Sequence, residues 1–157
     1  MTGRAEVGRL EKRLDSTFQR IKVLAATADI EVQSDFARYL CVLVSGYLEK
    51  AVAELVLEHA RRNGGTTLQR FVELKTRRFM NADAQHLMEL LGNFHPEWRR
   101  DLEKFLIDDI RDAVNSVVGL RNSIAHGGAS EITYHRISGY YERIKKVVTY
   151  IGGLCGV

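Results

Sequence analysis

The chain carries an arginine, an asparagine and a histidine within six positions, followed by two glycines: Arg121, Asn122, His126, Gly127 and Gly128. Histidine titrates near neutral pH, so it can take a proton from a ribose 2′-hydroxyl or give one to a leaving 5′-oxygen. Arginine stays protonated and can bind a phosphate bidentately, which stabilises charge on the nonbridging oxygens. Asn122 can orient the imidazole or the substrate. These residue types predict phosphate binding and proton transfer, the chemistry of RNA cleavage without a metal.

The spacing of these residues indicates how a helix end would present them. Asn122 and His126 are four residues apart and share a helix face, whereas Arg121 and His126 are five apart and diverge by about 140°. Both side chains can still reach a common groove, most easily if a second copy of the chain supplies the other wall. A twofold arrangement gathers two arginines and two histidines into one basic cleft. The spacing therefore favours a homodimer with the cleft at its interface.

A structural role for the same residues is the alternative. Basic side chains are common in the last turn of a helix, where they bond the terminal carbonyls and complement the helix dipole. An arginine and a histidine at this spacing also occur often by chance. The sequence leaves open whether Arg121 and His126 act on a substrate or cap a helix.

No other group of residues suggests a chemical site. His86, His95 and His135 lack a second histidine or carboxylate at a recognised metal-ligand spacing, so we expect no metal. Asp108 and Asp109 stand at a predicted helix start, where acids complement the helix dipole. The glycine pairs lack the flanking strand of a phosphate-binding loop, so we also expect no cofactor.

Apolar residues recur at three and four positions along most of the chain, which predicts an all-α protein. Glycine pairs, one proline and N-capping residues divide this pattern into a compact bundle of five to seven helices. The predicted segments are about 4–28, 34–63, 66–78, 81–94, 96–106, 108–126 and 130–151. The second is apolar almost all round in its first half, which predicts a central helix. The candidate N-caps are Ser34, Thr66 or Thr67, and Asn81 or Asp83, and the last helix is expected to start at about Ser130 or Thr133.

Length and composition fit a single domain over residues 1–157, with 45% hydrophobic residues and a formal charge of +3. The longest charge-free stretch, Tyr39 to Leu48, is shorter than the roughly 20 residues of a membrane span. The N-terminal residues lack the hydrophobic region of a secretory signal. Cys41 and Cys155 have unlike settings that suggest neither a disulfide framework nor a zinc site. We expect a protein of the reducing cytoplasm with no membrane contact.

Two stretches of the chain resemble the HEPN domain family, in particular its RiboL-PSP-HEPN type. Residues 118–127, VGLRNSIAHG, look like the RNxxxH motif of HEPN domains. Residues 37–40 and 45–50 look like an earlier helix of the RiboL-PSP-HEPN type. The resemblance covers most of the chain, roughly residues 34–151.

This resemblance implies a helical bundle, usually a homodimer, whose active members are metal-independent endoribonucleases. Such members act in toxin–antitoxin, abortive-infection and other antiphage systems. By the resemblance, Arg121 and His126 are the catalytic pair and Asn122 is the accompanying polar residue. Three residues of the earlier helix match the family without a role that the sequence assigns: Ser45, Tyr47 and Glu49.

One position departs from a subgroup of the family. In HEPN toxins paired with minimal nucleotidyltransferase antitoxins, a tyrosine that the partner modifies follows the histidine by two positions, where this chain has Gly128. Neutralisation by nucleotide transfer to that tyrosine is therefore not expected.

Two functional hypotheses follow. The first is an endoribonuclease toxin or antiphage defence effector that cleaves RNA by 2′-hydroxyl attack, with an antitoxin or a defence-system protein as a candidate partner. The second is a non-catalytic HEPN module that binds RNA, a nucleotide or a partner protein.

Overall fold

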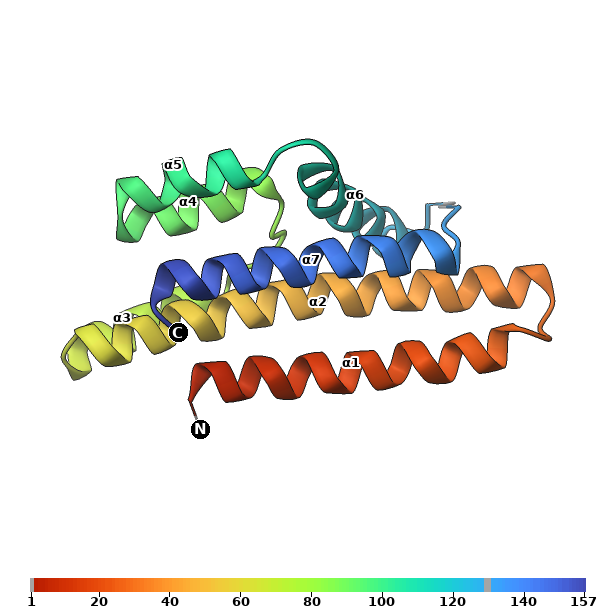
Figure 1. Ribbon diagram of the computed structural model, residues 1–157, viewed down its shortest axis with the longest axis horizontal. Helices are drawn as coiled ribbons and strands as arrows, with labels where there is room; N and C mark the ends of the chain where they lie inside the picture. The colour runs from red at the N-terminus through yellow and green to blue at the C-terminus, as the bar shows by residue number, and fades with distance from the viewer. Residues whose placement is uncertain (1, 129–130) are drawn as a thin grey trace.

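The structure, a computed structural model, describes residues 2–128 and 131–157. These residues form seven α-helices and no strand (Figure 1). The helices are α1 (Gly3–Ala25), α2 (Ile30–Asn63), α3 (Thr66–Thr76), α4 (Ala84–Phe94), α5 (Pro96–Phe105), α6 (Asp108–Ala125) and α7 (Tyr134–Cys155). The predictions of an all-α fold and of five to seven helices are confirmed.

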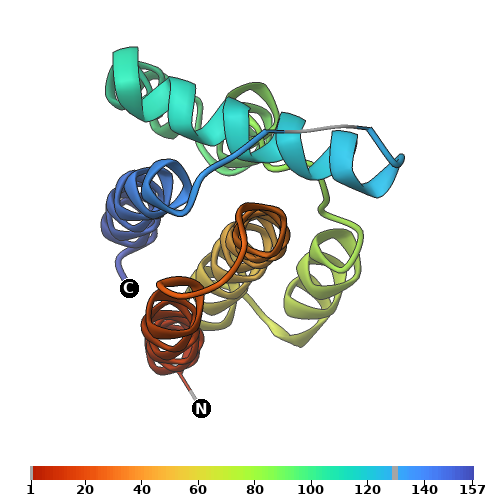
Figure 2. The ribbon, with the colours of Figure 1, turned by 90° about the vertical axis from the view of Figure 1, so that its right-hand side faces the viewer.

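The longest helix, α2, lies at the centre of the arrangement. α1 runs beside it in the opposite direction, and α7 runs beside it in the same direction (Figure 1). α6 packs on both α2 and α7 and crosses them, as the end-on view in Figure 2 shows. α3 packs on α2, and α4 and α5 form a hairpin. The predicted central position of the second helix is confirmed.

Apolar stripes of α2 and α7 form the middle of the core. The fully buried side chains recur every four residues on α2 and every seven on α7: Leu40, Val44, Leu48, Val52 and Val56, then Ile137, Ile144 and Ile151. The seven-residue spacing keeps the side chains of α7 on one helix face, whereas each four-residue step on α2 advances by about 40°, so its buried side chains spread over a broad face. Truncating one of the leucines to alanine would cost about 2–5 kcal/mol. This contact provides the rigid platform on which α6 lies.

The start of α2 differs from the prediction. The helix begins at Ile30 with Asp29 at the N-cap, so Ser34 lies inside the helix and is not its cap. The side-chain amide of Gln33 donates to the carbonyl oxygens of Ala25 and Ala28, at 2.9 Å each. This side chain from the first turn of α2 closes the connection, which is therefore shorter than the sequence pattern indicated.

The predicted N-cap Asp83 and the predicted helix start near Thr133 are confirmed. The side-chain oxygen of Asp83 accepts the backbone N–H of His86 at 2.9 Å, and that of Thr133 accepts the N–H of Arg136 at 3.2 Å. Ser130, the other candidate for the last helix, lies outside the described residues. Short polar side chains at α4 and α7 thus satisfy N–H groups that the helix itself cannot bond.

Glycines changed two other helix ends. α3 begins at Thr66 with Gly65 at the N-cap in extended backbone, so the predicted threonine cap is wrong. α7 continues to Cys155, beyond its predicted end, because Gly152 stays helical and Gly156, at φ 71°, ends the helix instead. A glycine pair within a sequence therefore need not mark the end of a helix.

The chain turns between α5 and α6, so the predicted new helix near Asp108 is confirmed. Val114 and Val117 of α6 are fully buried, and the carbonyl of Val117 lies 3.7 Å from the thiol of Cys41 on α2. After Val118, no residue of α6 is fully buried. The last turns of the helix therefore lie at the surface.

Two polar contacts fix the orientation of α6. The side-chain oxygen of Asn115 accepts the N–H of Ala84, the first residue of α4, at 3.0 Å. The carboxylate of Asp109 accepts a hydrogen bond from Arg143 of α7 at 2.8 Å. Helix α6 is thus anchored in its first half, and its C-terminal end is presented outward.

None of the described helices is long and apolar enough to cross a membrane. Both cysteines are free and buried. Burial raises the pKa of Cys41 to about 11 and that of Cys155 to about 12. Both thiols therefore stay protonated at neutral pH.

Candidate active site

The C-terminal end of α6 closes through its own backbone. The N–H of Gly128 bonds the carbonyl of Ser123 at 2.8 Å, and the N–H of Gly127 bonds that of Ile124 at 3.1 Å. Gly127 has a φ of 74°, the left-handed region that favours glycine. The N–H of His126 bonds the carbonyl of Asn122 at 3.1 Å. Backbone N–H groups therefore satisfy the carbonyls of the last turn.

This closure bears on the role of the two basic side chains. Within residues 2–128 and 131–157, neither the guanidinium of Arg121 nor the imidazole of His126 bonds a helix carbonyl. A capping role would require such a bond. The described contacts thus leave the guanidinium of Arg121 and the imidazole of His126 available to a ligand.

The side chains of Arg121 and Asn122 lie against each other. A guanidinium nitrogen of Arg121 donates to the amide oxygen of Asn122 at 3.2 Å, and both residues are half-buried. Among the described residues, Arg121 has no carboxylate partner. The guanidinium is therefore oriented by one neutral bond and keeps further donors for an anion.

His126 lies just beyond α6, at the C-cap, with φ −93° and ψ 11°. Its side chain is exposed and has no hydrogen bond or ion pair with the described part of the chain. The structure thus brings the side chains of Arg121 and Asn122 into contact, while no described bond joins the imidazole of His126 to either side chain. One copy of the chain presents the three residues on one surface segment without connecting them into a single unit.

Gly128 has a structural reason to be glycine. A Cβ at this position would lie 2.5 Å from the hydroxyl oxygen of Ser123 and 3.0 Å from its carbonyl oxygen. A tyrosine could not occupy this position without moving Ser123 or opening the helix end. The position where the toxin subgroup carries its modified tyrosine is therefore part of the helix closure in this chain.

Tyr47 is a packing residue rather than a surface group. Its ring is buried and meets the ring of Tyr141 edge to face at a centroid distance of 5.8 Å. Its hydroxyl donates to the carboxylate of Glu11 on α1 at 3.1 Å. Burial, with the carboxylate of Glu11 beside it, raises the pKa of Tyr47 far above its ordinary value. Tyr47 therefore connects α1, α2 and α7 and does not exchange a proton at neutral pH.

The other two matched residues of α2 also lie away from the described contacts of Arg121. The carboxylate of Glu49 accepts the N–H of Asn81, in the segment before α4, at 3.0 Å. Ser45 is 1% exposed, and its hydroxyl has no partner among the described residues. Glu49 thus holds a connecting segment, and Ser45 is out of reach of a ligand.

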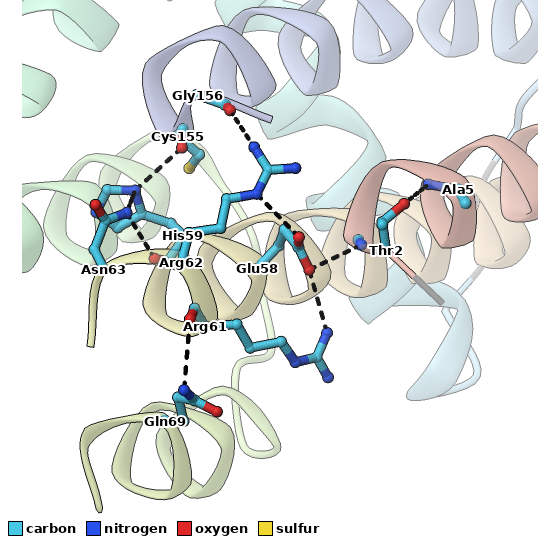
Figure 3. Close-up of polar contacts among 11 residues, drawn as sticks. Thr2, Ala5, Glu58, His59, Arg61, Arg62, Asn63, Gln69, Cys155 and Gly156 are labelled. Carbon is cyan, nitrogen blue, oxygen red and sulfur yellow. Dashed lines mark hydrogen bonds and ion pairs between the residues drawn. The ribbon is translucent and has the colours of Figure 1, made fainter. Parts of the chain in front are cut away.

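A second polar cluster, which the sequence analysis did not find, lies at the other end of the molecule (Figure 3). The carboxylate of Glu58 on α2 accepts the N–H of Gly3 at 3.1 Å and a bond from Arg62 at 3.0 Å. Arg61 lies 3.5 Å from the same carboxylate. The bond from Gly3, with those from the arginines, holds the pKa of Glu58 below its usual range. This cluster fastens the start of α1 to α2.

The same cluster caps α7. A guanidinium nitrogen of Arg62 donates to the carbonyl of Gly156 at 2.6 Å, and the imidazole of His59 bonds the carbonyl of Cys155 at 3.1 Å (Figure 3). The bonded residues of this cluster are up to 96 positions apart in sequence. No local sequence pattern predicts such contacts, so they become visible only in the folded structure.

The histidines first considered as metal ligands lie apart. His86 contacts the carboxylate of its neighbour Asp83 at 2.7 Å, and His95 packs on Trp98 at a ring distance of 4.7 Å. In the portion of the chain that the structure describes, no three His, Cys, Asp or Glu side chains gather as metal ligands would. Of the residues that the sequence singled out for chemistry, those at the end of α6 remain the candidates in the described chain.

Comparison with protein families matches the chain to a known family. The family model described as RiboL-PSP-HEPN matches residues 9–155, which is nearly the whole chain. No curated protein and no solved structure matches the chain. The match includes α6 and its terminal Arg121–Gly128 segment.

Proposed function

The chain belongs to the RiboL-PSP-HEPN family, and from this premise we propose that it is a metal-independent endoribonuclease with Arg121, Asn122 and His126 as its site. HEPN domains are often RNases, and they commonly bind RNA and form dimers. The observation that carries the proposal is the end of α6. Its carbonyls are bonded by backbone N–H groups, so the arginine and the histidine are not required as caps.

The reaction assigns one task to each group. The ribose 2′-oxygen attacks the adjacent phosphorus, its proton passes to an imidazole, and the bond from phosphorus to the 5′-oxygen breaks. A protonated imidazole supplies the proton for that leaving oxygen. The products are a 2′,3′-cyclic phosphate and a 5′-hydroxyl. Arg121 binds the nonbridging oxygens, whose charge grows in the transition state, and Asn122 positions Arg121 through their 3.2 Å bond.

Two imidazoles are needed at once in this scheme, one as base and one as acid, and each chain has one at this position. A homodimer with α6 ends facing each other supplies both, because a twofold axis repeats the same patch on the other copy. The exposure of His126 and the partial exposure of Arg121 suit such an interface. The cleft would then contain four cationic or titrating groups around one phosphate.

Cleavage in the absence of metal tests the activity. Purified protein incubated with transfer RNA or total RNA in EDTA should produce fragments that end in a cyclic phosphate. His126→Ala should produce none, while His135→Ala, which removes an exposed histidine of α7, should cleave like the parent. Equal cleavage by the parent and His126→Ala would refute the assignment.

The cellular role proposed is that of a toxin or antiphage effector acting in the cytoplasm, restrained by an antitoxin or a defence-system protein. Expression of the parent in a bacterial host should arrest growth, and expression of His126→Ala should not. Because Gly128 replaces the modifiable tyrosine, restraint should come from binding and not from nucleotide transfer at that position. Growth arrest by both proteins would contradict a role for cleavage.

The lack of a described bond between Arg121 and His126 also favours a second candidate, a non-catalytic module that binds RNA, a nucleotide or a partner protein. Such a module would bind RNA without cutting it, and His126→Ala would bind as the parent does. Binding without fragments in the parent would select this candidate.

A further inference from the structure

A groove runs between α1 and α2, and we call it the α1/α2 groove. It encloses about 320 Å³ and is lined by residues that include Arg13 and Arg20 of α1 and Tyr39, Val42, Gly46 and Lys50 of α2. Figure 2 shows α1 and α6 on opposite sides of α2, so the groove is separate from the Arg121–Gly128 segment.

The charges along this groove have one sign. Arg13, Arg20 and Lys50 line it, and no carboxylate does. In the described chain, Arg13 and Lys50 have no ion-pair partner, and Arg20 donates only to the hydroxyls of Ser16 and Thr17, at 3.0 and 3.1 Å. Two of these cations lie seven residues apart on α1, which is about 10 Å along the helix axis. The groove therefore presents a line of unneutralised positive charge.

The adjoining hollow between α1, α2 and α3 differs in this respect. It shares Arg13 and Lys50 with the groove, but four glutamates also line it. In the described chain, three of its four arginines are paired with glutamates, as in the contacts of Arg9 with Glu6 at 2.5 Å and of Arg77 with Glu73 at 3.2 Å, whereas the shared Arg13 is not. Charge thus changes along one continuous surface, from neutralised pairs to free cations.

The walls of the groove also suit flat, partly apolar groups. The ring of Tyr39 is 53% exposed and makes no ring contact in the described chain, and Val42 beside it is 39% exposed. A Cβ added at Gly46 would meet nothing within 4 Å, so the groove floor is open at this point. An exposed tyrosine next to a line of cations is the combination that binds single-stranded nucleic acid, because bases stack on the ring while phosphates meet the charges.

We propose that the α1/α2 groove binds the backbone of single-stranded RNA, with a base stacked on Tyr39. The proposal rests on the proposed function for the identity of the polyanion. The groove lies across α2 from α6, so it holds a part of the RNA away from the reacting phosphate. It therefore increases affinity for RNA and takes no part in the chemical step.

Binding measured in the His126→Ala protein tests the groove independently of cleavage. The probe is a fluorescein-labelled single-stranded RNA of about 15 nucleotides, followed by anisotropy between 50 and 200 mM salt. The double variant Arg13→Gln/Lys50→Gln should bind about tenfold more weakly. Its slope of log affinity against log salt should be smaller by about 1.4, because each lost phosphate contact of a single strand removes about 0.7.

A second double variant controls for net charge. Lys12→Gln/Lys146→Gln removes the same charge from exposed positions outside the groove, and its affinity and salt slope should stay close to those of His126→Ala alone. Tyr39→Ala should weaken binding about fivefold or more, whereas Tyr39→Phe, which keeps the ring, should not. This pattern would establish the groove even if the parent cleaves no RNA.

Three results would overturn the proposal. The first is equal salt slopes for the two double variants, and the second is an absence of RNA binding by the His126→Ala protein. The third is a protein that binds phosphatidylserine vesicles but not RNA, with the vesicle binding lost in Arg13→Gln/Lys50→Gln. That result would assign the groove to a lipid surface. Cleavage by the parent in EDTA is scored separately, so a failure of the groove is distinguishable from a failure of the proposed activity.

Discussion

Two helix ends in this molecule are built in the same way but carry different partners. Gly127 follows the C-cap of α6 and Gly156 is the C-cap of α7, both in left-handed backbone, and the closing bonds are 2.8 Å from Gly128 to Ser123 and 2.9 Å from Val157 to Gly152. At α7, two basic side chains from α2 bond the terminal carbonyls. At α6, the basic side chains of the helix itself bond none in the described chain.

The bonding partners of these basic side chains distinguish those with a structural role from those that are available to a ligand. His59 and Arg62 have carbonyl partners, and Arg62 also bonds a carboxylate, so their positions are explained by stability. Arg121 has one neutral neighbour, and its position is explained by no described ion pair. The same residue types at the same kind of helix end therefore have different described partners, and this difference predicts different roles.

The largest expected effect is on activity at the α6 end. Arg121→Ala and His126→Ala should each lower the rate of RNA cleavage about a thousandfold, because a charge-stabilising donor or a proton-transfer group is lost. The free energy of unfolding should change by less than about 0.5 kcal/mol, since no described cap is removed. Cleavage assays and urea unfolding measure the two quantities. If these variants instead lost about 2 kcal/mol of stability and still cleaved RNA, the basic side chains would have the same structural role at α6 as at α7.

At the α7 end, the effect should fall on stability. Glu58→Gln should lower the free energy of unfolding by about 2 kcal/mol at pH 7, because charged hydrogen bonds are weakened. The folded protein lowers the pKa of Glu58, so this contribution is complete above its ordinary pKa of 4.5 and is lost as pH falls through the folded value. The gap between parent and variant in urea unfolding should therefore narrow below about pH 4.5.

A matched control for that measurement is Glu73→Gln, which breaks an exposed pair with Arg77 and should cost less than about 0.5 kcal/mol. RNA cleavage should be unchanged in both glutamate variants. A gap for Glu58→Gln that widened as the pH fell would contradict the assigned role of its carboxylate.

The two glycines allow the same substitution to be compared at both helix ends. Gly127→Ala and Gly156→Ala should each cost about 1 kcal/mol, because a side chain is strained in left-handed backbone. Only Gly127→Ala should also lower RNA cleavage, about tenfold, since it displaces His126 beside it. Thermal unfolding and cleavage assays on both variants check this. An equal loss of cleavage at both ends would indicate a general loss of folded protein.

The smallest effect is expected at Ser45, whose side chain has no described partner and is not accessible to solvent. Ser45 is buried, so its lack of a partner cannot indicate a ligand site. Ser45→Ala should change the free energy of unfolding by less than about 0.5 kcal/mol and leave cleavage unaltered, because no described hydrogen bond is lost. A large loss in either assay would mean that an unpartnered side chain can matter even when buried, which would weaken the comparison of the two helix ends.

Much of the fold could be predicted because its signals are local. Apolar periodicity, Pro96 and the caps at Asp83 and Thr133 all act within one or two turns of a helix. The errors arose where a neighbouring group intervened, as when Gln33 closed the turn before α2 or when Gly152 was kept helical within the core. The tendency of glycine to end a helix does not predict the backbone at a buried position, because tertiary packing can override that tendency.

The candidate site shows the same limit. The identity of Arg121 and His126 and their position at a helix end follow from residue types and the glycines after them. Whether they have partners does not, because the basic side chains that bond the end of α7 come from up to 96 residues away. The contact that fastens the N-terminus, between Gly3 and Glu58, spans 55 residues and has no local pattern either.

The two buried cysteines make the chain convenient for site-directed labelling. Cys41 and Cys155 are inaccessible and stay protonated at neutral pH, so a maleimide should react with neither while the protein is folded. A single cysteine introduced at the exposed Ala125, in the last turn of α6, would then take the only label. One spin label per chain at that position would report directly how close two copies bring their α6 ends.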